Sequence, residues 1–83
     1  MDEVQILVLV DGSVLITGIG VVTSELGEPD CKLTKPYQIV DGTLVKWLKY
    51  YTDDDSIMIT SDKIMTIVDP KQSLFDDYSA LIK

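Results

Sequence analysis

The sequence has no histidine, no arginine and only one cysteine, and each shortage removes a class of function. Cys31 cannot form a disulfide within the chain, and without histidine only this thiol and the carboxylates are left as metal ligands. Arginine is the side chain that best binds phosphate and guanine through paired hydrogen bonds, so its absence weighs against nucleic-acid recognition. We therefore expect no structural disulfide, no metal and no cofactor.

Positive charge is scarce as well. Seven lysines stand against fourteen acidic residues, which gives a formal net charge of −7. Affinity for nucleic acids comes largely from basic side chains that neutralise phosphates, so we expect no DNA binding, and RNA binding only through a local basic patch. The acidic start Met1-Asp2-Glu3 does not resemble a secretory signal, and the apolar run 4–10 is too short to span a membrane. These features predict a cytoplasmic protein without a membrane partner.

The chain length predicts one domain, residues 1–83, with a small core. A chain of this size buries only about 60% of its unfolded surface, so its stability is marginal without additional support. Disulfides and metals are already unfavourable, which leaves oligomerisation as the remaining common source of stability.

The first half of the sequence has the pattern of a β-hairpin. Residues 4–10 are apolar on both alternating faces, and residues 14–22 are rich in β-branched side chains. Asp11-Gly12 between them is a strong turn signal. Gly18 and Gly20 interrupt the second strand and predict a bulge or bend.

The middle of the sequence is less regular. Residues 32–40 predict a third strand, in which Pro36 must lie at an edge or a break because it lacks the backbone N–H. Asp41-Gly42 predicts another tight turn. Residues 44–52 fit either a helical stripe or a strand, and we favour the strand because valine, tryptophan and paired tyrosines prefer sheets. The adjacent Asp53-Asp54-Asp55 lacks the spacing of a calcium loop and is interpreted as a solvated loop.

The last third combines two short strands with a helix. Residues 57–60 and 64–68 flank Ser61-Asp62-Lys63 in the pattern of a second hairpin, which Asp69-Pro70 ends. Apolar residues then recur at spacings of three and four, which predicts an amphipathic helix over about 73–82. Ser73, with Asp76 three residues later, resembles a weak capping box at its start.

Two segments carry a resemblance to a known family. The first is Leu9-x-Asp11-Gly12-x-x-Leu15-x-Thr17-x-Ile19, and the second is Ile57-x-Ile59-Thr60-Ser61-Asp62-Lys63-Ile64-x-x-Ile67. Each is similar to one of the two apolar-turn-apolar motifs of the Sm-like (LSm) family of small ring-forming proteins. The resemblance implies a mainly β fold, a small and strongly bent five-stranded barrel of the Sm-like or SH3-like kind, with the short helix placed at the C-terminus. The strands occupy residues 4–68.

The resemblance also implies a mode of assembly. In this family the fourth strand pairs with the fifth strand of a neighbouring subunit, and repetition closes a ring. Ile57 and Ile59 of one subunit would then lie beside Ile64 and Ile67 of the next. The turn between these strands would face the central pore, where its four residues could contact a ligand or could serve only to reverse the chain: Thr60, Ser61, Asp62 and Lys63.

The sequence departs from the family at the positions that matter for RNA. RNA-binding members carry an asparagine in the loop that ends the first motif and an Arg-Gly pair in the second motif. Here residues 24–30 contain no asparagine, and Thr60-Ser61 replaces the Arg-Gly pair. The family's glycine position is Thr17, with Gly18 one residue later. We therefore expect self-assembly, with RNA binding weaker than in the family.

Two other readings of the sequence lead to different functions. Trp47, Tyr50 and Tyr51 could bind a protein partner on a monomeric SH3-like adaptor, or could stack bases beside Lys46 and Lys49, but core or subunit-interface packing is the commoner role of such residues. An enzyme is the least favoured reading, because no pair of carboxylates is singled out and Cys31 has acidic neighbours that disfavour a thiolate.

Overall fold

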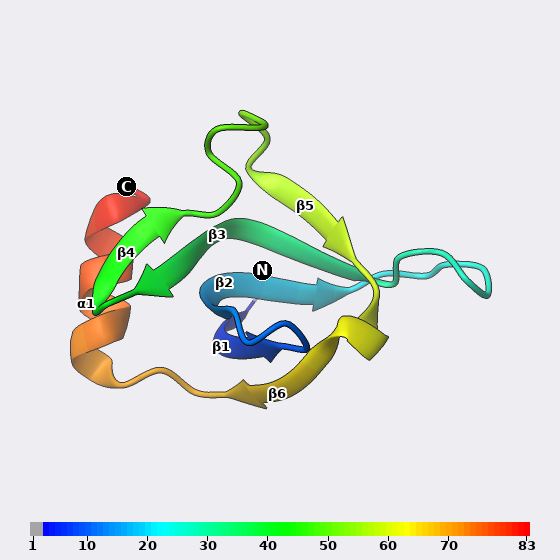
Figure 1. Cartoon of the computed structure of the whole chain (residues 1–83), viewed down its shortest axis with the longest axis horizontal. Coiled ribbons are helices and arrows are strands. Elements are labelled where there is room, and N and C mark those ends of the chain that lie inside the picture. The colour runs from blue at the N-terminus through cyan, green and yellow to red at the C-terminus, as the bar shows by residue number, and fades with distance from the viewer. Residues whose placement is uncertain (1–2) are drawn as a thin grey trace.

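The computed structural model describes residues 3–83, which form one mainly β domain with a short C-terminal helix (Figure 1). The chain order is β1 (Glu3–Leu9), β2 (Val14–Val21), β3 (Cys31–Val40), β4 (Thr43–Lys46), β5 (Ser56–Ile59), the 3-10 turn η1 (Ser61–Lys63), β6 (Ile64–Val68) and α1 (Gln72–Leu81). The mainly β class and the C-terminal helix are confirmed.

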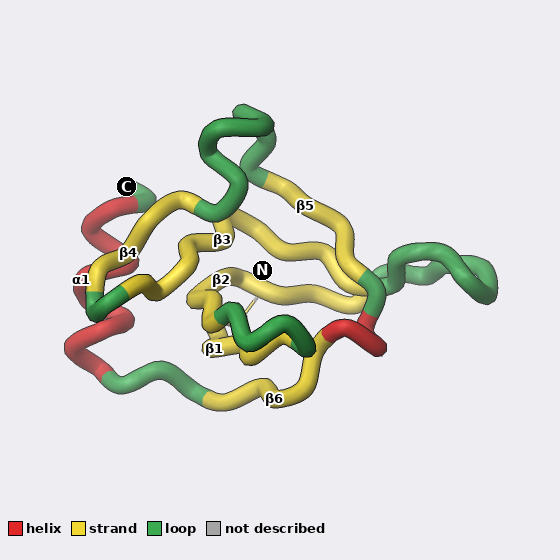
Figure 2. Tube along the Cα trace, in the orientation of Figure 1, coloured by secondary structure: helices red, strands yellow, loops and turns green. Residues whose placement is uncertain are grey.

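The strands form one antiparallel sheet in the order β4-β3-β2-β1-β6. The long strand β3 has two partners along the same edge: β4 pairs with its second half and β5 with its first half. Figure 2 shows β4 and β5 in line on this edge, separated by the loop 47–55. The described chain therefore has six strands, two of them sharing one edge of β3, where the family resemblance implies a five-stranded barrel.

A bulge divides β3 into these two halves. Ile16 lies opposite Tyr37 and Gly18 lies opposite Thr34, so Thr17 faces the two residues Lys35 and Pro36. Lys35 has a positive φ of 50°, a backbone conformation that residues other than glycine rarely adopt. This conformation bends the strand at the bulge. The prediction that Pro36 marks a break is confirmed, and the bend lies beside the glycines of β2.

The two faces of the sheet are covered by different parts of the chain. On the inner face, Leu7, Leu9, Leu15 and Leu33 are buried, and Trp47, Ile19, Ile59 and Ile64 pack against them. On the outer face, Tyr78 of α1 is 1% exposed, and its ring meets the ring of Tyr37 edge-on at 5.8 Å. On β1 the inner-face residues Leu7 and Leu9 are buried, whereas Ile6 and Val8 on the other face are only partly buried.

The expected strand over residues 44–52 is wrong beyond Lys46. Residues 47–51 form turns instead, with Leu48 at a positive φ of 61°. The Trp47 N–H still donates to the Pro36 carbonyl of β3 at 3.0 Å, but Pro36 has no N–H to return a bond, and the chain turns away at Leu48 while Trp47 packs against the buried leucines. The helical alternative is not formed either.

The expected hairpin of residues 57–60 and 64–68 is also wrong. β5 pairs with β3 and β6 pairs with β1, and the two strands diverge from η1 (Figure 1). Each short strand extends a longer neighbour, and Ile59 and Ile64 pack against the same core from opposite edges of the sheet. The sheet is therefore open between β5 and β6 over the described residues, and the closed barrel stays a prediction.

The ends of the smaller elements agree with their turn signals in part. Asp41 and Gly42 both have positive φ, 49° and 78°, as a two-residue hairpin turn requires. The helix Gln72–Leu81 confirms the predicted 73–82. Ser73 does not cap it, because the N-cap residue is Lys71 and no side-chain capping bond is formed. The Gln72 amide instead donates to the Asp76 carboxylate at 2.9 Å.

Candidate functional site

The edge strand β6 exposes apolar side chains along most of its length. It pairs with β1 on one side and with no other described strand on the other. Met65 is 65% exposed, Ile67 52% and Val68 48%. An open edge offers unpaired N–H and C=O groups to any strand that approaches, and proteins usually protect such edges with charge or proline. Neither is present within Ile64–Val68.

The strand β5 is a second unprotected edge. Its four residues pair with Cys31–Thr34 of β3 and leave the opposite side open among the described strands. Met58 is 45% exposed, Ile57 is half-buried, and the strand contains no charge and no proline. The structure thus places Ile57 and Ile59 on one open edge and Ile64 and Ile67 on another, and does not pair them within the subunit.

The turn between the two edges is fastened to the loop before β3. The Asp30 carboxylate accepts hydrogen bonds from the Ser61 backbone N–H at 2.7 Å and from the Ser61 hydroxyl at 2.8 Å. These bonds lower the pKa of Asp30. A hollow of about 230 Å³ lies beside this contact, and its charged lining residues are all acidic: Glu28, Asp30 and Asp62. Of the four predicted turn residues, Thr60, Ser61 and Asp62 line this acidic hollow and Lys63 does not, so the hollow disfavours phosphate.

The contact between Asp30 and Ser61 predicts a pH dependence. Replacing Asp30 by alanine should loosen η1, and the Ser61 amide proton should shift upfield in an NMR spectrum. Because the folded pKa of Asp30 is lowered, the contact is complete above the ordinary aspartate pKa near 3.8 and is lost as the pH falls through the lower folded value. An acid titration that moves the Ser61 amide equally in the wild type and in Asp30→Ala would contradict this assignment.

The three predicted aromatic residues have separate environments. Trp47 packs against the core, whereas Tyr50 and Tyr51 are 84% and 85% exposed on the loop 47–55. The Lys49 ammonium lies 4.9 Å from the centre of the Tyr50 ring, in a cation–π contact. In the sequence the three residues form one candidate contact surface, but in the structure only Tyr50 and Tyr51 are exposed to solvent.

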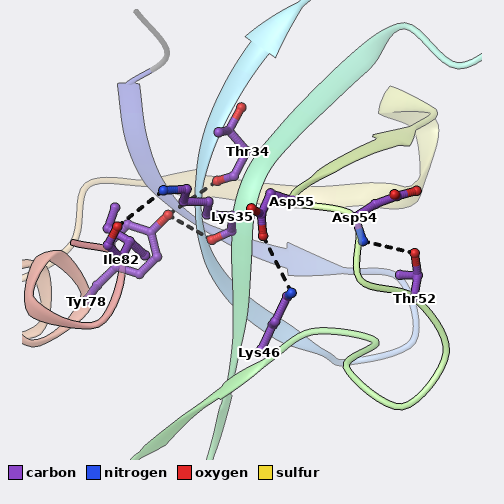
Figure 3. Close-up of polar contacts among 8 residues, drawn as sticks. All are labelled: Thr34, Lys35, Lys46, Thr52, Asp54, Asp55, Tyr78 and Ile82. Carbon is purple, nitrogen blue, oxygen red and sulfur yellow. Dashed lines mark hydrogen bonds and ion pairs between the residues drawn. The ribbon is translucent and has the colours of Figure 1, made fainter.

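Figure 3 shows the polar contacts that fix the neighbouring loop and the helix. The Tyr78 hydroxyl donates to the Lys35 carbonyl at 2.8 Å, and the Lys35 ammonium donates to the Ile82 carbonyl at 3.2 Å. Lys46 forms an ion pair with Asp55 at 3.5 Å. The roles of Lys35 and Asp30 were not predicted. Nothing in the sequence indicates a lysine with a left-handed backbone conformation or a contact between two distant loops.

The chemistry-bearing side chains elsewhere do not converge. Burial, followed by the charge of Asp30, raises the pKa of the Cys31 thiol, which makes the reactive thiolate less available. Within residues 3–83 no three histidine, cysteine, aspartate or glutamate side chains gather in a way that could hold a metal ion. Asp53, Asp54 and Asp55 are all exposed to solvent. Over the same residues, no helix is long and apolar enough to cross a membrane.

These features define a small antiparallel β domain with a C-terminal helix and two open, apolar edge strands. The chain belongs to a family of unknown function, DUF6561, whose family model matches residues 2–83. A comparison with curated proteins found no match.

Proposed function

We propose that this protein is a self-assembling, Sm-like ring protein, in which β5 of one subunit pairs with β6 of the next. The observation that carries the proposal is the pair of uncharged, apolar, open edges on one sheet. When β4 and β5 are counted as one interrupted strand, the sheet has the five strands of a bent Sm-like barrel. β5 is then the last part of the fourth strand, and β6 is the fifth.

The two edges differ from each other, and this determines the type of assembly. A contact between two different surfaces joins copies head to tail. A row of joined copies then has an unpaired β5 at one end and an unpaired β6 at the other until the row closes into a ring. A symmetric dimer through β6 alone would leave every β5 edge exposed. Ring closure is the arrangement that covers every β5 and every β6 edge.

Self-assembly also supplies what the small core lacks. Among the described residues, seven apolar side chains are buried, and several large ones on the edge strands are exposed. Each square ångström of apolar surface removed from water contributes about 25 cal/mol. Covering Met58, Met65, Ile67 and Val68 between subunits would therefore stabilise a domain that is too small to be robust alone.

The acidic turn supports an assembly role more than an RNA-binding one. Asp62 lies on η1, and the Asp30 carboxylate accepts a hydrogen bond from Ser61 of the same turn. The resemblance places the pore ligand at this turn. A ring repeats these carboxylates once per subunit, which increases the local negative charge. We therefore propose a cytoplasmic, non-catalytic assembly protein whose affinity for uridine-rich RNA is weak.

The native mass in solution tests the proposal. Size-exclusion chromatography with light scattering should give one species whose mass is a multiple of 9.2 kDa, and electron microscopy should show closed particles of uniform size. A monodisperse 9.2 kDa species at micromolar concentration would exclude the ring. That result would favour the monomeric adaptor, in which the exposed Tyr50 and Tyr51 bind another protein.

A further inference from the structure

Tyr50 and Tyr51 bury little of their surface within their own subunit, where the Lys49 ammonium lies over the Tyr50 ring. Both are more than four-fifths exposed, yet the backbone of their loop is well fixed. The N–H groups of Tyr51 and Thr52 donate to the Leu48 carbonyl at 2.9 and 3.1 Å, and the Lys35 N–H donates to the Asp55 carbonyl at 2.6 Å. The loop 47–55, called here the tyrosine loop, therefore presents two large side chains in a defined position.

The proposed strand pairing is too small to hold two subunits together alone. A four-residue strand such as β5 is only about 13 Å long. Stable protein interfaces bury about 800 Å² on each partner and involve about 20–30 residues a side. The four residues of β5 and the five of β6 fall well short of this, so flanking segments must add contact area.

The direction of the strands indicates which flanking segments meet. Every strand pair described in this sheet is antiparallel. If the next subunit continues the pattern, the chain that precedes Ser56 in one copy lies beside the chain that follows Val68 in the other. The tyrosine loop projects from the same β4–β5 edge of β3 that would receive the neighbour's β6 (Figure 1). It would therefore meet residues 69–75 of the neighbour, where α1 begins.

The chemistry of these two segments is complementary. Phe75 is 37% exposed and Val68 48%, so the neighbour offers apolar surface for the tyrosine rings. Lys71 is the N-cap residue of α1, and its side chain is exposed and forms no capping hydrogen bond. On the tyrosine loop, Asp53 and Asp54 are both exposed. Their neighbour Asp55 is the one that forms an ion pair with Lys46. Aromatic anchors with a charged rim are typical of the energetic centre of an interface.

We infer that the tyrosine loop docks on residues 69–75 of a second copy of this chain, with Tyr50 and Tyr51 as its apolar anchors and Lys71 facing Asp53 and Asp54. The inference rests on the proposed function, because it extends the pairing of β5 with β6. It assigns the two exposed tyrosines to the subunit interface rather than to a foreign partner.

The tyrosines are tested by a double substitution, Tyr50→Ser with Tyr51→Ser. Dilution followed by mass photometry should show at least a tenfold weaker association of subunits, because aromatic anchors dominate interface energy. Val21→Ser is the matched control, since Val21 is 87% exposed but lies at the end of an inner strand, and it should leave association unchanged. Circular dichroism should show that both variants keep the wild-type fold.

The charges give a second, independent measurement. Lys71→Glu should weaken association, and combining it with Asp53→Lys and Asp54→Lys should restore it, with the largest differences at low salt. A wild-type monomer would overturn both this inference and the proposed ring. An assembly that Ile67→Lys dissociates, but that the tyrosine and charge variants leave intact, would overturn only this inference.

Discussion

Substituting Ile67 by lysine should convert the assembly into folded monomers. Ile67 pairs with Leu7 at the open side of the sheet and is half exposed, so in a lone subunit the lysine can reach water at modest cost. In an assembled ring the neighbour's β5 would lie beside residue 67, and its apolar side chains would cover the ammonium without providing a partner for its charge. Charged side chains on edge strands are the usual means by which proteins prevent such pairing.

Met58→Lys on β5 should have the same effect from the opposite edge. Light scattering of each variant should give a mass of one subunit. Val10→Lys is the matched control, because Val10 is 55% exposed, close to the 52% of Ile67, but lies in the turn after β1. It should keep the wild-type mass.

Mixing the two edge variants gives the sharper result. The Ile67→Lys subunit retains an intact β5 and the Met58→Lys subunit retains an intact β6, so one native edge pair can form between them. The mixture should therefore contain heterodimers and no ring. Homodimers of either variant alone would show that one edge pairs with itself, which contradicts the head-to-tail arrangement.

Replacing Tyr78 by alanine should remove a large part of the stability of the domain. Tyr78 is the buried residue of α1, and truncating a buried aromatic side chain costs about 3–5 kcal/mol. A domain of this size has roughly 4–12 kcal/mol in total. Tyr78→Phe keeps the ring but loses the hydrogen bond to the Lys35 carbonyl, which should cost about 1 kcal/mol. Urea unfolding followed by circular dichroism measures both.

The same residue predicts a loss of stability at high pH. Burial raises the pKa of Tyr78 above its usual value of 10.0, so the folded state holds the phenolic proton more tightly than the unfolded chain. The associated stability is complete below pH 10 and is lost as the pH rises through the folded value. Tyr78→Phe should remove this part of the alkaline destabilisation. Equal alkaline slopes in the two proteins would contradict the assignment.

Much of the fold follows from local sequence signals. Apolar or β-branched runs and the turn signals between them placed β1, β2 and β3, and the Asp41-Gly42 turn has the backbone that its residues favour. The spacing of Leu74, Tyr78 and Leu81 placed α1 within one residue at each end. These elements were predictable because neighbouring residues determine them.

The parts that sequence reasoning missed depend on distant contacts. Whether residues 57–60 pair with 64–68 or with other strands is decided by β1 and β3, which lie far away in the sequence. β4 ends at Lys46, where the opposite strand reaches Pro36, which has no N–H to continue the ladder. The bond between Asp30 and Ser61 likewise joins two loops that no local pattern relates. The sequence identified residues 57–59 and 64–67 as strands that could form a subunit interface. It did not show that the two strands lie on separate edges of one sheet.

The pairing of Leu7 with Ile67 has a consequence for how the chain folds. β1, β2 and β3 are joined by short connections, so they can associate early, whereas β6 must close a loop that includes nearly the whole chain. During synthesis, β1 therefore emerges first and waits longest for its second neighbour. Until Ile64–Val68 leaves the ribosome, the nascent chain presents β1 itself as an open strand, and this is the stage at which we expect it to be most prone to aggregate.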